Sequence, residues 1–195
     1  MPLSIKHKKL STKDLLARSL YQLIEQKAFD KITVYHILEK AGVSRRTFYR
    51  YFSSKEKLMD YCLTCLIDEY YQEKKKFFNA KRSQEVFQVT LEFMYQKRRF
   101  LRSLIQSGHY DLFASKFNDN SVVIYKNFGL PWSLSGELNT RDLDYVSKGL
   151  IGAYINIIKF WLIKEEPDAP EIVAKDIALL FSSIPNYFQN YHPKD

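Results

Sequence analysis

The chain has 195 residues, 46% of them hydrophobic and 27% charged, so it can bury a core and is neither disordered nor collagen-like. Only six glycines and six prolines argue against Gly-rich phosphate loops and many-turned β-sandwiches, and two cysteines cannot build a disulfide framework. Residues 1–60 carry 13 basic and 6 acidic side chains, which gives them +7 of the total formal charge of +8. This concentration of positive charge predicts a segment that binds a polyanion. The alternative is a solubilising arm.

The first two helices are predicted from their ends. Ser11 stands three residues before Asp14, the spacing of a capping box, and apolar residues at helical spacing follow, which predicts a helix at about 12–27. Thr33 predicts the start of a second helix. That helix is short, because Gly42 readily takes the left-handed conformation that ends a helix.

A third short helix completes a helix-turn-helix pattern. Ser44 is its predicted N-cap, and Phe48 and Phe52 face inward, while its other face offers hydrogen-bond donors and flat rings. The major groove of DNA admits one α-helix, and arginine reads guanine through O6 and N7. Arg45 and Arg46 in the first turn therefore occupy positions suited to reading a groove.

The rest of the chain predicts further helices and gives few strand signals. We expect them at about 54–78, 83–97, 100–107, 110–128 with a break near 118–120, 142–164 and 168–189, with a loop at 129–140. The expected fold is all-α, with about nine helices. Residues 1–56 form a three-helix helix-turn-helix domain, and residues 57–195 form a larger helical domain.

The helix-turn-helix stretch resembles the DNA-binding domain of the tetracycline-repressor superfamily. The resemblance rests on Ile32-Thr33-Val34, on Ala41-Gly42-Val43-Ser44 and on the pattern T-F-Y-x-x-F-x-S-K-E-x-L at residues 47–58. It covers about 45 residues with the first helix included. It implies a regulator that binds double-stranded DNA, with a C-terminal domain for dimerisation and for a small-molecule effector.

The resemblance also implies roles for individual residues. Arg45, Arg46 and Thr47 would contact base edges. The residues expected at phosphates are Thr33, Tyr35, Ser44, Tyr49, Tyr51 and Lys55, in keeping with the anion affinity of capped helix N-termini and with phosphate positioning by Tyr and Lys. The alternatives are that Tyr51 flanks the core and that Lys55 is an ordinary solvated residue at a helix start.

For the C-terminal domain the resemblance covers the architecture only, and it implies that the last two long helices pair with their copies in a homodimer. The segment 142–164 is apolar on more than one face, and Gly149 and Gly152, each about 1 kcal/mol worse than Ala in a helix, suggest close backbone approach. The expected interface residues are Tyr145, Gly149, Gly152, Asn156, Ile177, Phe181 and Ile184. The alternative is an ordinary buried helix in a monomer. A Gly-x-x-Gly … Lys-Phe-Trp-Leu stretch is also similar to a subset of the superfamily that includes activators of dihydroxyacetone operons.

The resemblance places an effector pocket in the same domain. Aromatic residues that would line an apolar cavity with polar handles are Phe87, Tyr95, Phe113, Phe117, Tyr125, Tyr154 and Trp161. Few charges fall among them, which favours an uncharged or weakly polar ligand. The alternative is that these side chains are simply core.

Catalytic and metal chemistry is not supported by the sequence. The four histidines are scattered, and Cys62 and Cys65 form a single C-x-x-C on a helix without a second pair for zinc, so we expect them to pack in the core. We expect no enzyme activity, no cofactor, no metal and no membrane partner, and a cytoplasmic protein.

The expected function is that of a homodimeric regulator, a repressor, that binds a palindromic operator and is released or modulated by an unknown small-molecule effector. The alternative is a coactivator that works mainly through a partner protein or a small molecule.

Overall fold

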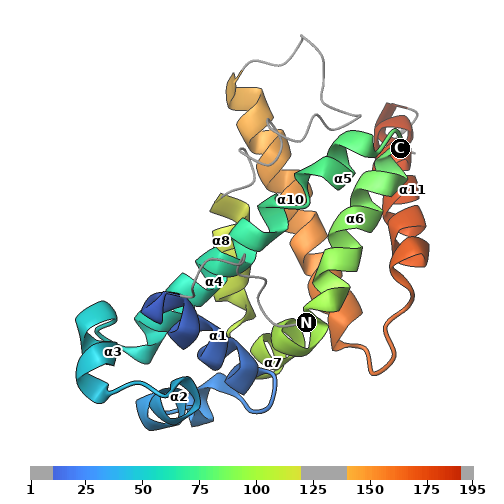
Figure 1. Cartoon of the computed structure of the whole chain (residues 1–195). Coiled ribbons are helices and arrows are strands. Elements are labelled where there is room, and N and C mark those ends of the chain that lie inside the picture. The colour runs from blue at the N-terminus through green and yellow to red at the C-terminus, as the bar shows by residue number, and fades with distance from the viewer. Residues whose placement is uncertain (1–10, 120–139, 190–195) are drawn as a thin grey trace, which may run out of the picture.

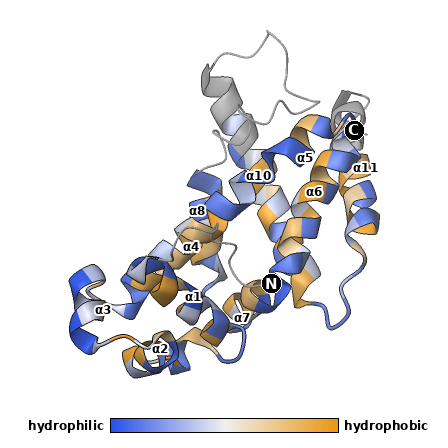
Figure 2. Ribbon diagram, viewed as in Figure 1, coloured by the Kyte–Doolittle hydropathy of each residue, from blue (hydrophilic) through white to orange (hydrophobic). Residues whose placement is uncertain are grey.

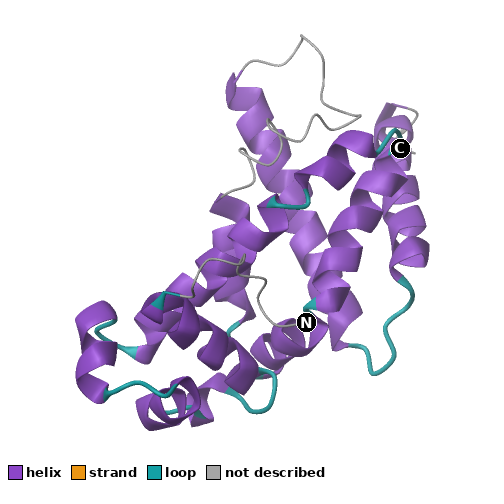
Figure 3. Ribbon diagram, in the orientation of Figure 1, coloured by secondary structure: helices purple, strands orange, loops and turns teal. Residues whose placement is uncertain are grey.

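The structure, a computed structural model, describes residues 11–119 and 140–189, and their side chains except at 140–144, 146, 147 and 181–189. Within these residues all regular elements are helices (Figure 3), which confirms the all-α prediction. They are α1 (Thr12–Ile24), the 3₁₀ turn η1 (Phe29–Lys31), α2 (Val34–Ala41), α3 (Arg45–Tyr51), α4 (Lys55–Tyr71), α5 (Lys74–Asn79), α6 (Ser83–Gln96), α7 (Arg98–Gln106), α8 (Tyr110–Asp119), α10 (Thr140–Ile163) and α11 (Pro170–Gln189).

The predicted capping box of α1 is present. The Asp14 amide donates to Ser11 Oγ at 3.2 Å, and the Ser11 amide donates to Asp14 Oδ2 at 3.2 Å. The helix ends at Ile24, three residues before the predicted end, and a hydrogen-bonded turn follows it. The amides of the next two residues after Glu25 both donate to the Leu23 carbonyl. This turn leads into η1, whose Phe29 is buried.

The turn between α2 and α3 is confirmed. Gly42 has φ 65°, and its amide donates to the Leu38 carbonyl, so a left-handed residue ends α2. An L-residue here would pay about 1 kcal/mol of strain, since its Cβ crowds the carbonyl in that conformation. Ser44 then caps α3, as predicted.

The long fourth helix was predicted as one piece at about 54–78, which is wrong. The structure divides it into α4 and α5 with a turn at Gln72 and Glu73. In a straight helix, residues seven apart are separated by about 10.5 Å along the axis. The turn brings the buried ring of Phe77 edge-on to Tyr70, with 5.6 Å between their centroids. Burial of this aromatic pair outweighs the helix propensity of Gln72 and Glu73, where the helix is interrupted.

The helices form two regions joined by α4 (Figure 1). We call α1–α3, with η1, the head, and α5–α11 the body. Helix α4 packs on α1 in the head and on α8 in the body, while α11 lies along α6 and α10 packs on α7 and α8. In the coloured parts of α6, α10 and α11 hydrophobic residues alternate with hydrophilic ones, whereas α3 is mainly hydrophilic (Figure 2). None of the helices in the described part of the chain is long and apolar enough to cross a membrane.

Candidate nucleic-acid interface

Helix α3 is anchored by a series of aromatic contacts that leads from α3 to α4 and from there to α1. Phe48 is completely buried, and its ring lies 6.1 Å from that of Phe52. The Phe52 ring in turn lies 5.5 Å from Tyr61 on α4, whose hydroxyl donates to Asp14 Oδ1 at 2.9 Å. Helices α1, α3 and α4 are thereby locked together, so the orientation of the outer face of α3 is fixed by the core.

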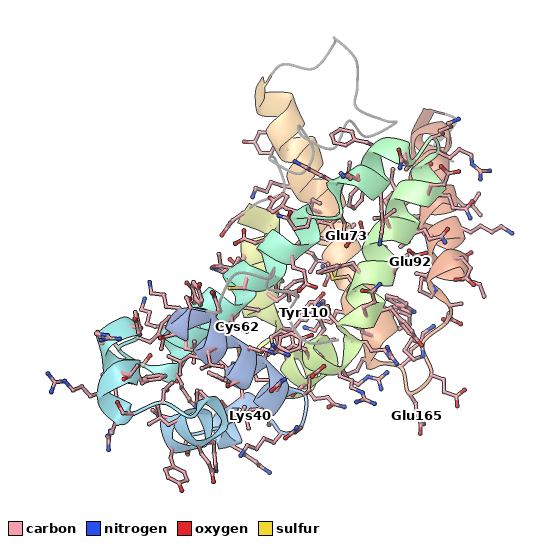
Figure 4. All side chains as sticks on the ribbon, viewed as in Figure 1. Lys40, Cys62, Glu73, Glu92, Tyr110 and Glu165 are labelled. Carbon is pink, nitrogen blue, oxygen red and sulfur yellow. The ribbon has the colours of Figure 1, made fainter. Side chains whose placement is uncertain are left out.

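The outer face of α3 is cationic. Arg45, Arg46 and Arg50 are exposed, and the first turn of α3 contains no acidic residue. The Arg45 guanidinium lies 5.6 Å from the ring of Tyr49, which is 46% exposed, an arrangement that pre-orders both side chains. Several nitrogen-tipped side chains of this region point away from the body (Figure 4). The arrangement suits a helix that enters a groove of DNA.

Two hydroxyls predicted at phosphates are helix caps. Ser44 Oγ accepts the Thr47 amide at 3.2 Å, and the hydroxyls of these two residues lie 2.9 Å apart. Thr33 Oγ1 accepts the His36 amide at 3.3 Å, while Tyr35 beside it is 69% exposed. The N-termini of α2 and α3 are therefore ordered, with the positive ends of their dipoles near the head's surface.

Tyr51 has a double environment. Its ring is half-buried against the core, in line with the alternative that it flanks the core. Its hydroxyl accepts a hydrogen bond from Arg50 Nη2 at 3.0 Å, and the ammonium of Lys13 lies 5.9 Å from the ring. The side chain thus joins the core to a cluster of cations.

Lys55 is tied to its own chain. Its ammonium donates to the carbonyls of Phe29 at 3.1 Å and Ile32 at 2.9 Å, with Asp30 O at 3.5 Å, and it lies 4.5 Å from the Phe29 ring centroid. An ammonium has three N–H groups, so this carbonyl cage occupies its donors. The geometry gives Lys55 a structural role at the junction of η1 and α4.

We therefore expect Lys55→Met, which keeps most of the aliphatic stem, to lower the free energy of unfolding by about 1.5–3 kcal/mol, since charge-assisted hydrogen bonds are lost. Urea titration followed by circular dichroism measures the change. Lys57→Met, at an exposed position one half-turn on, is the matched control and should stay within about 0.5 kcal/mol of the wild type. Unchanged stability of Lys55→Met, with weaker binding to all DNA and a flatter salt dependence, would instead make Lys55 a phosphate contact.

Of the predicted contacts, the structure brings Arg45, Arg46 and Tyr49 to one exposed face and Thr33 and Tyr35 to the start of α2. Two features of the head were missed. Arg50, exposed on α3, was not among the predicted contacts. His36 completes a capping box by accepting the Thr33 amide at Nδ1, 3.1 Å away. The spacing of His36 from Thr33 carried the signal, but the usual residue there is Glu or Gln.

The predicted pocket residues lie in the interior of the body. Phe87, Phe113, Phe117, Tyr154 and Trp161 are buried, Tyr95 is half-buried, and Tyr125 lies outside the described residues. The polar groups of two of them are satisfied within the chain, because Tyr154 OH donates to the Phe87 carbonyl at 3.0 Å and Trp161 Nε1 to the Asp168 carbonyl at 2.9 Å. These side chains form core in this structure.

The predicted interface residues divide into three groups. Tyr145, Gly149 and Asn156 are exposed on α10 and Gly152 is half-buried, and a Cβ built on either glycine meets no atom within 4 Å. Among the described residues, no close neighbour accounts for the two glycines. Ile177 is 3% exposed within one chain and packs in the core, so its placement in an interface is corrected to the core. The side chains of Phe181 and Ile184, in α11, lie outside those described.

The cysteines are core residues. Cys62 is buried with Sγ 3.7 Å from the Ala17 carbonyl, and Cys65 is half-buried. Burial raises the pKa of both thiols, that of Cys65 to about 11. In the described ranges, 11–119 and 140–189, we find no group of three His, Cys, Asp or Glu side chains placed to hold a metal ion.

The raised pKa of Cys65 predicts low reactivity. At pH 7.5 the raised pKa should make its thiolate fraction about two orders of magnitude smaller than that of a free cysteine. Since only the thiolate is nucleophilic, the thiol should react slowly. Iodoacetamide labelling followed by mass spectrometry should leave both cysteines of the folded protein almost unmodified, and both should react after unfolding in urea. Fast labelling of the folded chain would contradict the observed burial.

Comparison with known proteins identifies the head. Residues 18–62 match the model of the bacterial regulatory proteins of the tetR family. The helix-turn-helix-type dhaKLM operon transcriptional activator DhaS of Lactococcus lactis is 32% identical over 54 residues, which cover 28% of this chain and 29% of that protein. An uncharacterized helix-turn-helix-type transcriptional regulator of Bacillus subtilis, YxbF, is 24% identical over 172 residues, which cover 84% of this chain and 43% of that protein. The chain thus spans less than half of the length of these curated relatives.

Solved structures share the fold over most of the chain. A structure of the dihydroxyacetone kinase operon activator DhaS has a TM-score of 0.64 at 16% identity and covers 89% of this chain and 95% of that one. A TetR transcriptional regulator from Streptococcus agalactiae 2603V has a TM-score of 0.59 at 20% identity, with 87% and 92% covered. The likeness to the dihydroxyacetone-operon activator is confirmed at the level of fold. Over residues 18–62 the chain is similar to the tetR family of bacterial regulatory proteins.

Proposed function

We propose that the protein is a sequence-specific DNA-binding transcription regulator that acts as a homodimer and represses from a palindromic operator. The single observation that carries the proposal is the cationic outer face of α3, where Arg45 and Arg46 stand exposed on a helix whose orientation is fixed by buried Phe48. Direct readout of guanine needs such donors on a rigid helix. The division at residue 56 into a DNA-binding part and an effector and dimerisation part, and a cytoplasmic location with access to DNA, belong to the same proposal.

Dimerisation is supported by the surface of the last two helices. Tyr145 is 74% and Phe160 67% exposed on α10, and Ile172 is 54% exposed on α11. Large apolar residues that stay exposed on the last two helices are typical of a surface that another chain covers. The two α10 glycines, with free space around their Cβ positions, would allow close approach of the second chain. Two copies of α10 and α11 would then form a four-helix interface, and two heads would lie about one DNA turn, 34–36 Å, apart.

Regulation by a small molecule completes the proposal. The aromatic interior between α4, α6, α8 and α10 holds the hydroxyls of Tyr70, Tyr110 and Tyr154. Tyr70 OH lies 2.8 Å from Thr90 Oγ1, and the other two donate to backbone carbonyls, each at 3.0 Å. An uncharged or weakly polar ligand could exchange such internal hydrogen bonds for its own. Its binding would favour a head-to-head spacing that no longer matches the operator, a shift of populations between two states.

Selection of bound duplexes from a random pool, with the full chain at moderate salt, tests DNA recognition. We expect enrichment of a two-fold symmetric sequence with half-sites about 10 base pairs apart, centre to centre. Recovery of unrelated sequences would favour the alternative of a coactivator that works through a protein partner. A reporter gene behind the selected sequence then gives the sign of regulation. We expect repression. Higher expression in the presence of the protein would make it an activator, which is what the name of the Lactococcus lactis relative says of that protein.

A further inference from the structure

Besides the continuous helix α4, two contacts join the described parts of the head and the body, one on α7 and one on the turn that follows it. The first is buried. The Tyr21 ring of α1 stacks on Phe100 of α7 with 4.4 Å between centroids. Just before α7, Lys97, 1% exposed, donates to Glu69 of α4 at 2.6 Å and lies 5.9 Å from the Tyr21 ring. Buried stacking and a buried ion pair are hard to rearrange, so this contact behaves as a fixed pivot.

The second contact lies at the other end of α7 and is accessible to solvent. His109 Nε2 lies 2.8 Å from Asp30 Oδ1, a hydrogen bond between residues 79 positions apart. The imidazole is also edge-on to Phe29, with 5.1 Å between centroids. The exposed fractions of the side chains are 27% for His109 and 68% for Asp30, so this contact can break at little cost.

Each partner of the exposed contact is rigidly connected to a functional part of the molecule. Asp30 lies in η1, three residues before the N-cap of α2, and Lys55 binds the carbonyls on both sides of it. A displacement of Asp30 would therefore move the helix-turn-helix. His109 follows Gly108, whose φ of 75° ends α7, and its amide donates to the Leu104 carbonyl at 2.8 Å.

Helix α7 is fastened at the same time to α10. Arg102 donates from Nε to the Leu162 carbonyl at 2.9 Å and from Nη2 to the Lys164 carbonyl at 2.5 Å. It thus holds the C-terminal end of the helix that carries the exposed apolar face. A movement of α10 relative to the pivot would be transmitted by α7 to its far end, where His109 meets Asp30.

We propose that the His109–Asp30 contact is a latch that sets the angle of the head on the body and thereby regulates the affinity of the head for operator DNA. The inference rests on the proposed function and names a positioning pair for it. Neither residue lies on the outer face of α3. Of the two contacts, the latch is the one that can break easily. A movement in the body therefore changes the angle of the head by making or breaking the latch, while the buried contact at Tyr21 and Phe100 stays in place.

A double-mutant cycle on the full-length protein tests the latch. The dissociation constant for the selected operator duplex is measured for wild type, His109→Ala, Asp30→Ala and the double variant. We expect each single variant to change the dissociation constant at least threefold, both in the same direction, and the double variant to match the singles within twofold. His109→Gln, which keeps an N–H donor at similar reach, should stay within twofold of wild type. Gln106→Ala, exposed on the same helix, is the matched control and should change nothing.

Thermal unfolding and salt dependence separate a latch from other roles. All variants should keep the salt slope of the wild type, because no phosphate contact is removed. Single variants that change affinity less than threefold, additive effects in the double variant, or loss of affinity explained by unfolding at the assay temperature overturn the latch. If the wild type binds the selected duplex and the variants bind it with the same dissociation constant, only the latch is refuted. If the wild type selects no duplex, the proposed function is refuted and the latch with it.

Discussion

Replacing Arg45 or Arg46 by alanine is expected to weaken operator binding by about 2–6 kcal/mol for each position. One bidentate arginine–guanine contact contributes about 1–3 kcal/mol of discrimination, and a homodimer presents each arginine twice. The dissociation constant should therefore rise by about 30-fold to 10⁴-fold, at 1.4 kcal/mol for each factor of ten. Both side chains are exposed on α3, so the fold should be unaffected. Fluorescence anisotropy with the selected duplex measures the change.

A charge-matched control separates base reading from simple attraction. Lys40→Ala removes one exposed cation from the last turn of α2, outside α3 (Figure 4). It should lower the affinity for selected and unrelated duplexes by a similar small factor. The arginine variants should lose affinity mainly for the selected sequence. Equal losses on both kinds of DNA would show that Arg45 and Arg46 act only as charges.

The second large effect is expected at the α10 glycines. Gly149→Leu together with Gly152→Leu should convert the dimer into single chains of 23.1 kDa at micromolar concentration, as measured by analytical ultracentrifugation. No described atom lies within 4 Å of a Cβ built on either glycine, and leucine favours the helix by about 1 kcal/mol per position over glycine. The monomer should therefore be at least as stable as before, while close approach of a second α10 is blocked.

Gln106→Leu is the control for this pair, because it adds the same apolar group at an exposed position on α7. It should leave the mass of the dimer unchanged. A double glycine variant that remains a dimer would place the interface elsewhere. A wild type that sediments as one chain at the same concentration would remove the dimer from the account. In the proposed dimer two heads bind one operator, so the monomeric variant should also lose affinity for the palindrome but keep weak binding to a half-site.

The parts of the fold that the sequence predicts are those controlled by local chemistry. Ser11, Thr33 and Ser44 each accept the amide three residues on, because a short hydroxyl side chain at an N-cap can reach no other donor as easily. Gly42 ends α2 for an equally local reason, its left-handed backbone. The exposed arginines of α3 follow from the inward placement of Phe48 on a helix of known period.

The features that escaped prediction depend on contacts between distant segments. The break between α4 and α5 follows from the packing of Phe77 on Tyr70, and the carbonyl cage of Lys55 needs the chain at 29–32 to pass beside α4. Ile177 was expected in the dimer interface but lies in the core of its own chain, because α11 packs along α6, a contact between distant segments. The contact between His109 and Asp30 spans 79 positions and leaves no pattern in the sequence.

Protection of guanine N7 from dimethyl sulfate tests the central claim most directly, because N7 is the major-groove atom that an arginine on α3 would cover. On the selected operator the wild-type protein should protect two groups of guanines on one face of the duplex, about one helical turn apart, and Arg45→Ala with Arg46→Ala should abolish both. A bound complex that leaves every guanine N7 of the operator reactive, or that protects one group only, would contradict a pair of heads that lay α3 into successive major grooves.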